Sequence, residues 1–252
     1  KEHGDAKFDH NMSAELRKVA LAKLQKEGVK LINYGVVGLP NDEAECRKVF
    51  DFAKAMGIGV IVSEPPEDAF ELIDKLCSEY NIKVAIHNHP NPSHYWNPDT
   101  VLKVCQGRSK MIGACADTGH WTRSGINPLE AIKKLKGRII SSHLKDLNTF
   151  GIRSAHDVVW GNGVSLTADV LAELKKQGYK GSFSIEYEHN WLNSMPEIAG
   201  CVAFFRKTTA EMSDAPYKPV FKDDLSNAIT PGNSNKWVID GGVLTPAPDG
   251  HG

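Results

Sequence analysis

The chain has 252 residues, of which 41% are hydrophobic and 24% are charged, and its formal net charge is −1. This composition suits one large globular domain, or one domain with an appendage. The charge gives no electrostatic basis for binding nucleic acid or an anionic membrane surface, and no apolar run approaches the roughly 18 residues of a membrane-spanning helix.

The cysteines and the missing motifs narrow the class of protein further. The five cysteines are odd in number, widely spaced and form no CxxC pair, so we expect small buried residues rather than a disulfide framework. The absence of GxGxxG, of the P-loop GxxxxGK[ST] and of GxSxG argues against a nucleotide enzyme and a serine hydrolase. A polar segment opens the chain without an initiating Met, which leaves both a cytoplasmic and a periplasmic or secreted protein open.

Helical patterns alternate with short apolar runs along the chain. Ser13, Asp42 and Asn97 are typical helix N-caps, and Gly28 is a typical helix stop. The predicted strands are 29–37, 58–64, 82–89, 111–117, 137–143 and 181–188, and the predicted helices start near 13, 42, 66, 97, 127, 167 and 194. Strands that alternate with helices predict a parallel sheet covered by helices.

Polar residues at the strand ends distinguish a doubly wound sheet from a closed barrel. Five successive strands end in Glu64, in His87 with His89, in Asp117, in His143 and in Glu186. In a barrel these residues converge on the one face where barrel enzymes keep their sites, whereas an open sheet spreads them along an edge. We therefore predict a (β/α)8 TIM barrel over residues 1–213. Because only six strands are found, we expect the first two to precede residue 1.

The segment 214–252 differs in composition from the rest. It is rich in Pro, Gly, Asn and Asp and contains two short strand-like runs, KWVID and GVLT. A segment of this size cannot bury a core alone. We expect a linker followed by the start of a β-rich domain.

The alternation of side chains along each strand predicts that the ionisable residues face the inside of the barrel. In 181–188 the alternate apolar residues suit the helix-covered outside, so Glu186 faces inward. The same alternation places His87, Asp117 and His143 inward. One such carboxylate could equally cap a helix or pair with a cation, but three separate coincidences are a poor explanation for Asp117, His143 and Glu186. Mixed histidine and carboxylate ligands suit Mn, Fe, Co or Zn better than Ca or Mg.

Glu64 and His87 compete for the remaining ligand position. Glu64 precedes two prolines that stiffen the strand exit, and its alternative role is a carboxylate at a helix N-terminus. The alternative for His87 is a hydrogen bond in the core. The sequence leaves this choice open.

Further polar and aromatic residues surround the predicted metal ligands. We expect substrate contacts from His89, His120, Trp121, Lys145 and Glu188. Trp121 suits either stacking on a sugar ring or core packing, and Lys145 either holds a substrate oxygen or pairs with Asp146. Arg123 and His94 are expected to be solvated loop residues.

Six segments carry a family resemblance. SEPPED, AIHNHP, CADTGHW, GRIISSHLKD, WGNG and SIEYEHNW, in this order and spacing, resemble the sugar phosphate isomerase/epimerase family of the xylose isomerase-like TIM barrels, over about residues 10–210. The resemblance implies one divalent metal ion held by Glu, Asp, His and Glu on successive strands. Asp117, His143 and Glu186 fit this pattern, whereas His87 or Glu64 stands in for the first glutamate. In the family two metal-bound glutamates transfer protons, which makes Glu186 with Glu64 or His87 the expected acid/base pair.

The tail carries a second resemblance. FKDDLSNAI and KWVIDGGVLTP are similar to the opening of a 3-keto-disaccharide hydrolase (DUF1080-like) domain. Fusion to such a domain implies that the barrel acts on keto-sugars or glycosides.

These features together predict an enzyme class. We expect a metal-dependent isomerase or epimerase of a sugar, keto-sugar or sugar phosphate, which removes the proton next to a carbonyl. The same enolisation would serve a 3-keto-glycoside lyase or hydrolase. An endonuclease IV-like phosphodiesterase, which the charge and the ligand number disfavour, and a non-catalytic sugar-binding barrel are the alternatives. The expected partner is a small sugar, with no nucleic acid or membrane partner, and a homo-oligomer is left open.

Overall fold

The computed structural model of the chain describes residues 7–212, 237–240 and 243–246. The helices are α1 (Ala14–Lys26), α2 (Glu43–Ala55), the 3₁₀ turn η1 (Glu67–Ala69), α3 (Phe70–Tyr80), α4 (Pro98–Val104), α5 (Thr118–Arg123), α6 (Pro128–Lys134), α7 (Thr167–Lys176) and α8 (Met195–Glu211). The strands are β1 (Asn33–Tyr34), β2 (Val60–Ser63), β3 (Lys83–His87), β4 (Ile112–Asp117), β5 (Ile139–Leu144), β6 (Asp146–Leu147), β7 (Asp157–Val158), β8 (Phe183–Ile185), β9 (Trp237–Asp240) and β10 (Val243–Pro246).

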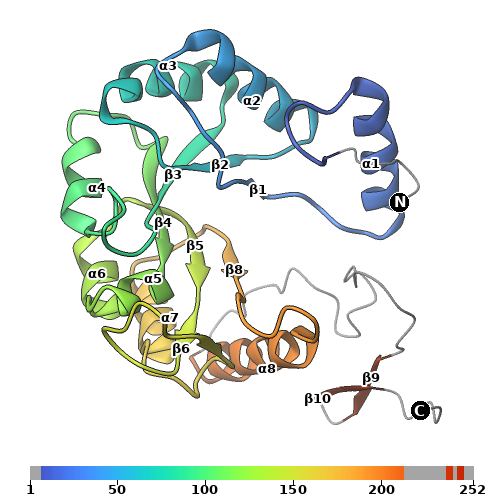
Figure 1. The fold of residues 1–252 in the computed structure, drawn as a ribbon, viewed down its shortest axis with the longest axis vertical. Coiled ribbons are helices and arrows are strands. Elements are labelled where there is room, and N and C mark those ends of the chain that lie inside the picture. The colour runs from blue at the N-terminus through green and yellow to red at the C-terminus, as the bar shows by residue number, and fades with distance from the viewer. Residues whose placement is uncertain (1–6, 213–236, 241–242, 247–252) are drawn as a thin grey trace.

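Six parallel strands form one curled sheet in the order β1-β2-β3-β4-β5-β8. The strands lie along the inner side of an arc of helices (Figure 1). Within the described residues the sheet is open between β1 and β8, although the side-chain amide of Asn33 donates to Oγ of Ser182 at 2.8 Å. This half-barrel with helices outside confirms the predicted barrel class.

Helix α2 shows how the sequence builds the outer layer. The carboxylate of Asp42 accepts the backbone N–H of Glu45 at 3.0 Å and caps the helix. Gly57 follows the helix with φ +71°, a conformation that glycine adopts without strain. Val49 and Phe50 are buried in the core. Each such side chain stabilises the fold by about 1.5–3 kcal/mol.

The two strands at the edges of the sheet are shorter than predicted. The predicted strand 29–37 is regular only at Asn33–Tyr34, and 181–188 only at Phe183–Ile185. Within the described residues each of these strands pairs on one side only. Val36, in the first of them, is 43% exposed. An edge strand has half the ladder hydrogen bonds of a central strand, so its ends leave regular geometry sooner.

A small antiparallel pair, β6 with β7, was not predicted. The carboxylate of Asp146 in β6 accepts three backbone N–H groups, those of Gly161, Gly163 and Ser165, at 2.8, 3.1 and 2.9 Å. These bonds hold the turn that contains the WGNG segment. Asp146 therefore faces this turn, and the alternative in which it pairs with Lys145 is wrong.

Most of the predicted second domain, 214–252, lies outside the described residues. Its two strand-like runs form the antiparallel pair β9 and β10. All five cysteines are buried and free, as expected of core residues. Among the described helices, none is both long and apolar enough to cross a membrane.

Candidate active site

Ionisable residues from five neighbouring strands meet at the carboxyl ends of the sheet. We call this group the strand-end cluster, and it consists of Glu64, His87, His89, Asp117, His120, His143, Lys145, Glu186 and Glu188. The strand register explains the convergence, because Asp117 pairs with His143, and His143 pairs with Ser184, two residues before Glu186. Side chains two residues apart share a face of the sheet.

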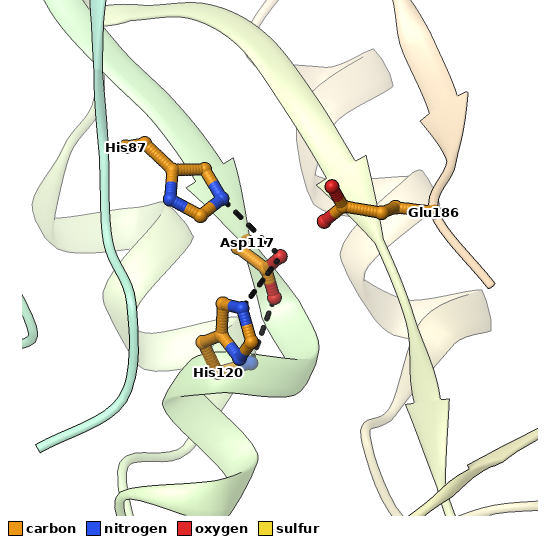
Figure 2. A group of neighbouring side chains, drawn as sticks. All are labelled: His87, Asp117, His120 and Glu186. Carbon is orange, nitrogen blue, oxygen red and sulfur yellow. Dashed lines mark hydrogen bonds and ion pairs between the residues drawn. The ribbon is translucent and has the colours of Figure 1, made fainter. Parts of the chain in front are cut away.

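Four members of the cluster could hold a metal ion. His87, Asp117, His120 and Glu186 offer ligand atoms that all lie within 4.8 Å of one another (Figure 2). Nε2 of His87 and Oδ2 of Asp117 are buried, lie 3.6 Å apart and make no hydrogen bond, although Oδ2 is ion-paired with Nζ of Lys145 at 2.9 Å. Buried polar atoms are rarely left without partners, and imidazole nitrogen with carboxylate oxygen suits a divalent transition metal. The residues present therefore fit a metal centre.

Glu64 supports His87 from the neighbouring strand end. Oε1 of Glu64 lies 3.1 Å from Nδ1 of His87, accepts the backbone N–H of His89 at 3.1 Å and contacts Nδ1 of His89. The hydroxyl of Ser93 donates to Oε2 at 2.9 Å. A carboxylate that accepts the Nδ1 proton of a histidine leaves Nε2 to face a metal. This geometry favours His87 as the ligand and Glu64 as its support.

The carboxylates around His87 set its protonation. Burial disfavours the imidazolium, but Asp117 and Glu64 outweigh burial and raise the pKa of His87 to about 9. Burial likewise disfavours the ionised Glu64, but hydrogen bonds with His87 and His89 hold the pKa of Glu64 well below its usual range. A metal ion that binds Nε2 of His87 therefore displaces a proton.

His143, a predicted ligand, lies beside the group of four. Its Nδ1 is 3.0 Å from Oε2 of Glu186, and its ring centroid is 5.0 Å from that of His87. His120, which was expected to contact substrate, takes its place among the four. The ligand role of His143 stays a prediction.

Lys145 is a buried ammonium group among three carboxylates. Its Nζ lies 2.9 Å from Oδ2 of Asp117, 2.7 Å from Oε2 of Glu186 and 2.8 Å from Oε2 of Glu188. Burial disfavours the charged lysine, but these carboxylates outweigh burial and raise its pKa. Gly119 makes room for the lysine, because a Cβ at this position would lie 2.5 Å from Cβ of Lys145.

Arg123 is a partly buried helix residue, which corrects the expectation of a solvated loop residue. It is the last residue of α5, and its side chain is 11% exposed. Its Nε donates to the carbonyl oxygen of Ala155 at 3.0 Å, and its Nη1 donates to Oε2 of Glu188 at 3.1 Å. Nη1 also lies 3.0 Å from Nδ1 of His120. Helix α5 begins directly after β4 and was not predicted, so the sequence did not show that residues 120 and 123 share a helix face.

Two other residues lie away from the cluster. Trp121 is 1% exposed and belongs to the hydrophobic core, so its ring is not available to stack on a sugar, and packing is its role. Successive helix residues point about 100° apart, which separates Trp121 from His120. His94 is exposed, as expected, and its Nε2 lies 3.0 Å from Glu67.

Asp157 of β7 pairs with Arg123. Its Oδ2 accepts the backbone N–H of Glu188 at 3.2 Å and lies 3.4 Å from Nη2 of Arg123, while its Oδ1 has no hydrogen-bond partner. Burial raises the pKa of Asp157 to about 6. The folded protein therefore holds this proton more tightly than the unfolded chain does.

This shift predicts a pH-dependent contribution of Asp157 to stability. A raised folded-state pKa stabilises the fold fully below the unfolded pKa of 3.8, and the stabilisation is lost as pH rises through about 6. A shift of about two units corresponds to about 3 kcal/mol. We therefore expect the free energy of unfolding of the wild type to fall by this amount between pH 3.8 and about 6, and Asp157→Asn to lack this fall. Urea unfolding at a series of pH values measures both. If the free energy of unfolding changed with pH in the same way in the wild type and in the variant, the raised pKa of Asp157 would be contradicted.

Comparison with known proteins agrees with this fold. A model of the xylose isomerase-like TIM barrel family matches residues 2–208. Among curated proteins, inosose dehydratase 2 of Bacillus cereus is 26% identical over 137 residues, which cover 49% of this chain and 46% of that protein. The match thus spans less than half the length of this relative.

Solved structures share the architecture. An uncharacterized protein from Parabacteroides distasonis ATCC 8503 superposes with a TM-score of 0.63 at 32% identity, covering 81% of this chain and 80% of that one. A D-tagatose 3-epimerase-like protein gives a TM-score of 0.66 at 22% identity, covering 80% and 86%. Two more distant structures of the fold are described with a zinc atom and with magnesium. The chain therefore belongs to the xylose isomerase-like TIM barrel family.

Proposed function

We propose that the protein is a metal-dependent isomerase or epimerase that moves a proton next to the carbonyl group of a keto-sugar. The observation that carries this proposal is Nε2 of His87, a buried atom without a hydrogen-bond partner, which lies 3.6 Å from Oδ2 of Asp117, the oxygen that pairs with the buried ammonium of Lys145. His87, Asp117 and Glu186, with His143 at their side, would hold a zinc, manganese, cobalt or iron ion. That ion would polarise the carbonyl group and stabilise the negative charge that develops on its oxygen.

Two groups are placed to carry protons. Glu186 at the end of β8 lies beside Lys145 and His143, which favour its ionised, basic form. The side chain of His89 after β3 is 47% exposed, and its contact with Glu64 through Nδ1 leaves Nε2 as a base. These strands lie on either side of β4 and β5. In this proposal Glu64 acts through His89, and His87 serves as a ligand.

The charge of the cluster favours an uncharged substrate. Four carboxylates, those of Glu64, Asp117, Glu186 and Glu188, face two permanent cations, Lys145 and Arg123. A divalent ion would offset the difference and leave no surplus positive charge for a phosphate group. We therefore propose a neutral keto-sugar, rather than a sugar phosphate, as the substrate.

Elimination of water is the second candidate reaction. It is favoured by the match to inosose dehydratase, which covers about half of this chain. Once the proton next to the carbonyl is removed, a hydroxyl group on the following carbon can leave as water if a donor supplies a proton. Lys145, held in its charged form, is a donor of the required kind.

Exchange of solvent deuterium tests the shared step. Metal-loaded protein is incubated in D2O with uncharged substrates, namely inosose, D-tagatose and a 3-keto-D-glucoside, and with a ketose phosphate. We expect deuterium next to the carbonyl of a neutral substrate, read by NMR. An epimer or isomer identifies the first reaction, and an unsaturated ketone identifies elimination. Stoichiometric metal binding without exchange in any substrate would overturn the proposal.

A further inference from the structure

The turn that follows Glu188 carries two exposed apolar side chains. Trp191 is 75% exposed, and Leu192 is completely exposed. Both lie in the segment that joins β8 to α8 (Figure 1), in a turn closed by the backbone N–H of Asn193, which donates to the carbonyl oxygen of Asn190 at 2.8 Å. Glycine, proline, asparagine, aspartate and serine are the usual residues of turns. Neither apolar side chain belongs to the core, and exposed apolar side chains that lie together are typical of binding sites.

Hydrogen bonds and a ring contact hold the backbone of this turn. The side-chain amide of Asn190 donates to the carbonyl oxygen of Asn193 and to Oε1 of Glu197, both at 3.0 Å. Directly before the turn, the ring of His189 stacks on that of His156 in the neighbouring segment, with the centroids 4.3 Å apart. The exposed tryptophan is therefore carried by an ordered backbone, so binding of a ligand has to order little more than its side chain.

Glu188 connects the turn with the strand-end cluster. Its Oε2 lies 2.8 Å from Nζ of Lys145 and 3.1 Å from Nη1 of Arg123, and its side chain is 36% exposed. Among the residues that the structure describes, none donates a hydrogen bond to its Oε1. A carboxylate oxygen accepts hydrogen bonds from hydroxyl groups, and a charged acceptor forms the stronger ones. Two cations thus fix one oxygen of Glu188 and leave the other as an acceptor between the cluster and the turn.

The spacing of these groups suits a ligand of more than one sugar ring. Trp191 comes three residues after Glu188, so their Cα atoms are at most about 11 Å apart. A ring bound at the strand-end cluster can contact Glu188, and a second ring joined to it lies at the distance of the turn. A sugar ring has hydroxyl groups around its edge and C–H groups on its faces. It therefore suits a carboxylate acceptor beside an exposed aromatic ring.

The composition of the segment favours an uncharged ligand. Residues 188–197, EHNWLNSMPE, contain two glutamates and neither lysine nor arginine. Such a segment repels anionic ligands and lacks the basic residues that attract an anionic membrane surface. Its asparagines and histidine are groups that exchange hydrogen bonds with neutral hydroxyl groups.

We propose that Glu188 and Trp191 form a second sugar subsite, so that the substrate is a neutral glycoside of at least two rings. The keto-sugar ring lies at the strand-end cluster, Oε1 of Glu188 accepts a hydroxyl group of the second ring, and Trp191 stacks on a face of that ring. This inference rests on the proposed function and deepens it, because it names the substrate class of the same site.

Fluorine NMR of the full, zinc-loaded chain labelled with fluorotryptophan tests the subsite without turnover. The signal of Trp191 is identified by its loss in Trp191→Phe. Cellobiose, maltose, lactose and trehalose are each titrated, with methyl β-D-glucoside as the ligand of one ring. We expect at least one disaccharide to shift the Trp191 signal to saturation and to bind more tightly than the methyl glucoside. A Trp191 signal that no disaccharide shifts, or equal affinity for one ring and for two, refutes the subsite.

Variants of Trp191 test the role of its ring. Because this side chain is 75% exposed, its removal leaves the core intact. Calorimetric titration with the best disaccharide should show about tenfold weaker binding to Trp191→Ala, and a smaller loss in Trp191→Phe, which keeps an aromatic face. Phe8→Leu is the control, since Phe8 is 49% exposed and packs on Phe52 of α2, outside the strand-end cluster. Unchanged affinity in Trp191→Ala, or an equal loss in Phe8→Leu, contradicts the proposal.

The alternative occupant of the turn is a second copy of the chain. Sedimentation tests it: a dimer that Trp191→Ala converts to a monomer, with no disaccharide shifting the Trp191 signal, would make the turn an interface and refute the subsite. Deuterium exchange into keto-sugars is measured separately. Exchange without a preference for two rings refutes the subsite alone, and disaccharide binding without exchange in any substrate refutes the proposed function alone.

Discussion

Lys145→Met is expected to lower the free energy of unfolding of the metal-free protein by about 3–5 kcal/mol, because removal of one partner leaves buried charges uncompensated. Its ammonium group pairs with Asp117, Glu186 and Glu188, and the lysine is fully buried. Methionine has a similar length and keeps the packing of the side-chain stem. Urea unfolding with a chelator present measures the loss. Deuterium exchange into a keto-sugar should also be lost.

A surface lysine provides the control for this result. Nζ of Lys134 lies 2.8 Å from Asp99, and the two side chains are 46% and 61% exposed. Exposed pairs contribute about 0–1 kcal/mol, so Lys134→Met should stay within that range. Equal losses in the two variants would show that the carboxylates around Lys145 do not depend on its charge.

His87→Ala and Glu64→Gln are expected to weaken metal binding to different extents. His87→Ala removes a ligand atom, so stoichiometric binding of Zn²⁺ should disappear. Glu64→Gln leaves the ligand and removes only its carboxylate support, so affinity should fall by about 10–100-fold. Competition with a coloured chelator measures both affinities, and elemental analysis gives the stoichiometry.

Glu67→Gln is the matched control for Glu64→Gln. Glu67 follows the same strand, but its carboxylate contacts the exposed His94 and Lys103 and takes no part in the strand-end cluster. Its substitution should leave zinc affinity unchanged. The reverse order, with metal retained by His87→Ala and lost by Glu64→Gln, would make Glu64 the ligand.

Strand parity was sufficient to predict which residues meet. Residues two apart on a strand share a face, and parallel strands end together, so His87, Asp117, His143 and Glu186 could be assigned to one end of the sheet. Their chemistry then indicated a metal. The alternation of helices and strands likewise predicted the barrel class, and the side-chain caps Ser13, Asp42, Asn97 and Asn127 mark the starts of four of its helices.

Parity could not predict what Arg123 and Trp121 do. Their positions depend on α5, which begins where β4 ends because Asp117 is both the last strand residue and the helix N-cap. The segment TGHWTR contains glycine and two threonines, which are weak helix formers. Its helical form depends on tertiary contacts, such as the hydroxyl of Thr118 donating to the carbonyl oxygen of Lys145 at 2.9 Å. Local patterns do not contain that information.

The close approach of Gly119 to Lys145 restricts how this site can diverge. The nearest lysine atom to an added Cβ is its own Cβ, at 2.5 Å, so every side chain at position 145 except glycine meets the same obstacle. A larger residue at 119 is therefore compatible only with glycine at 145, which lacks the ammonium group, or with a shift of α5, which carries His120 and Arg123. In variants that keep this lysine, a change of substrate therefore has to come from substitutions at other positions, for example at the exposed His89 or in the segment after β8.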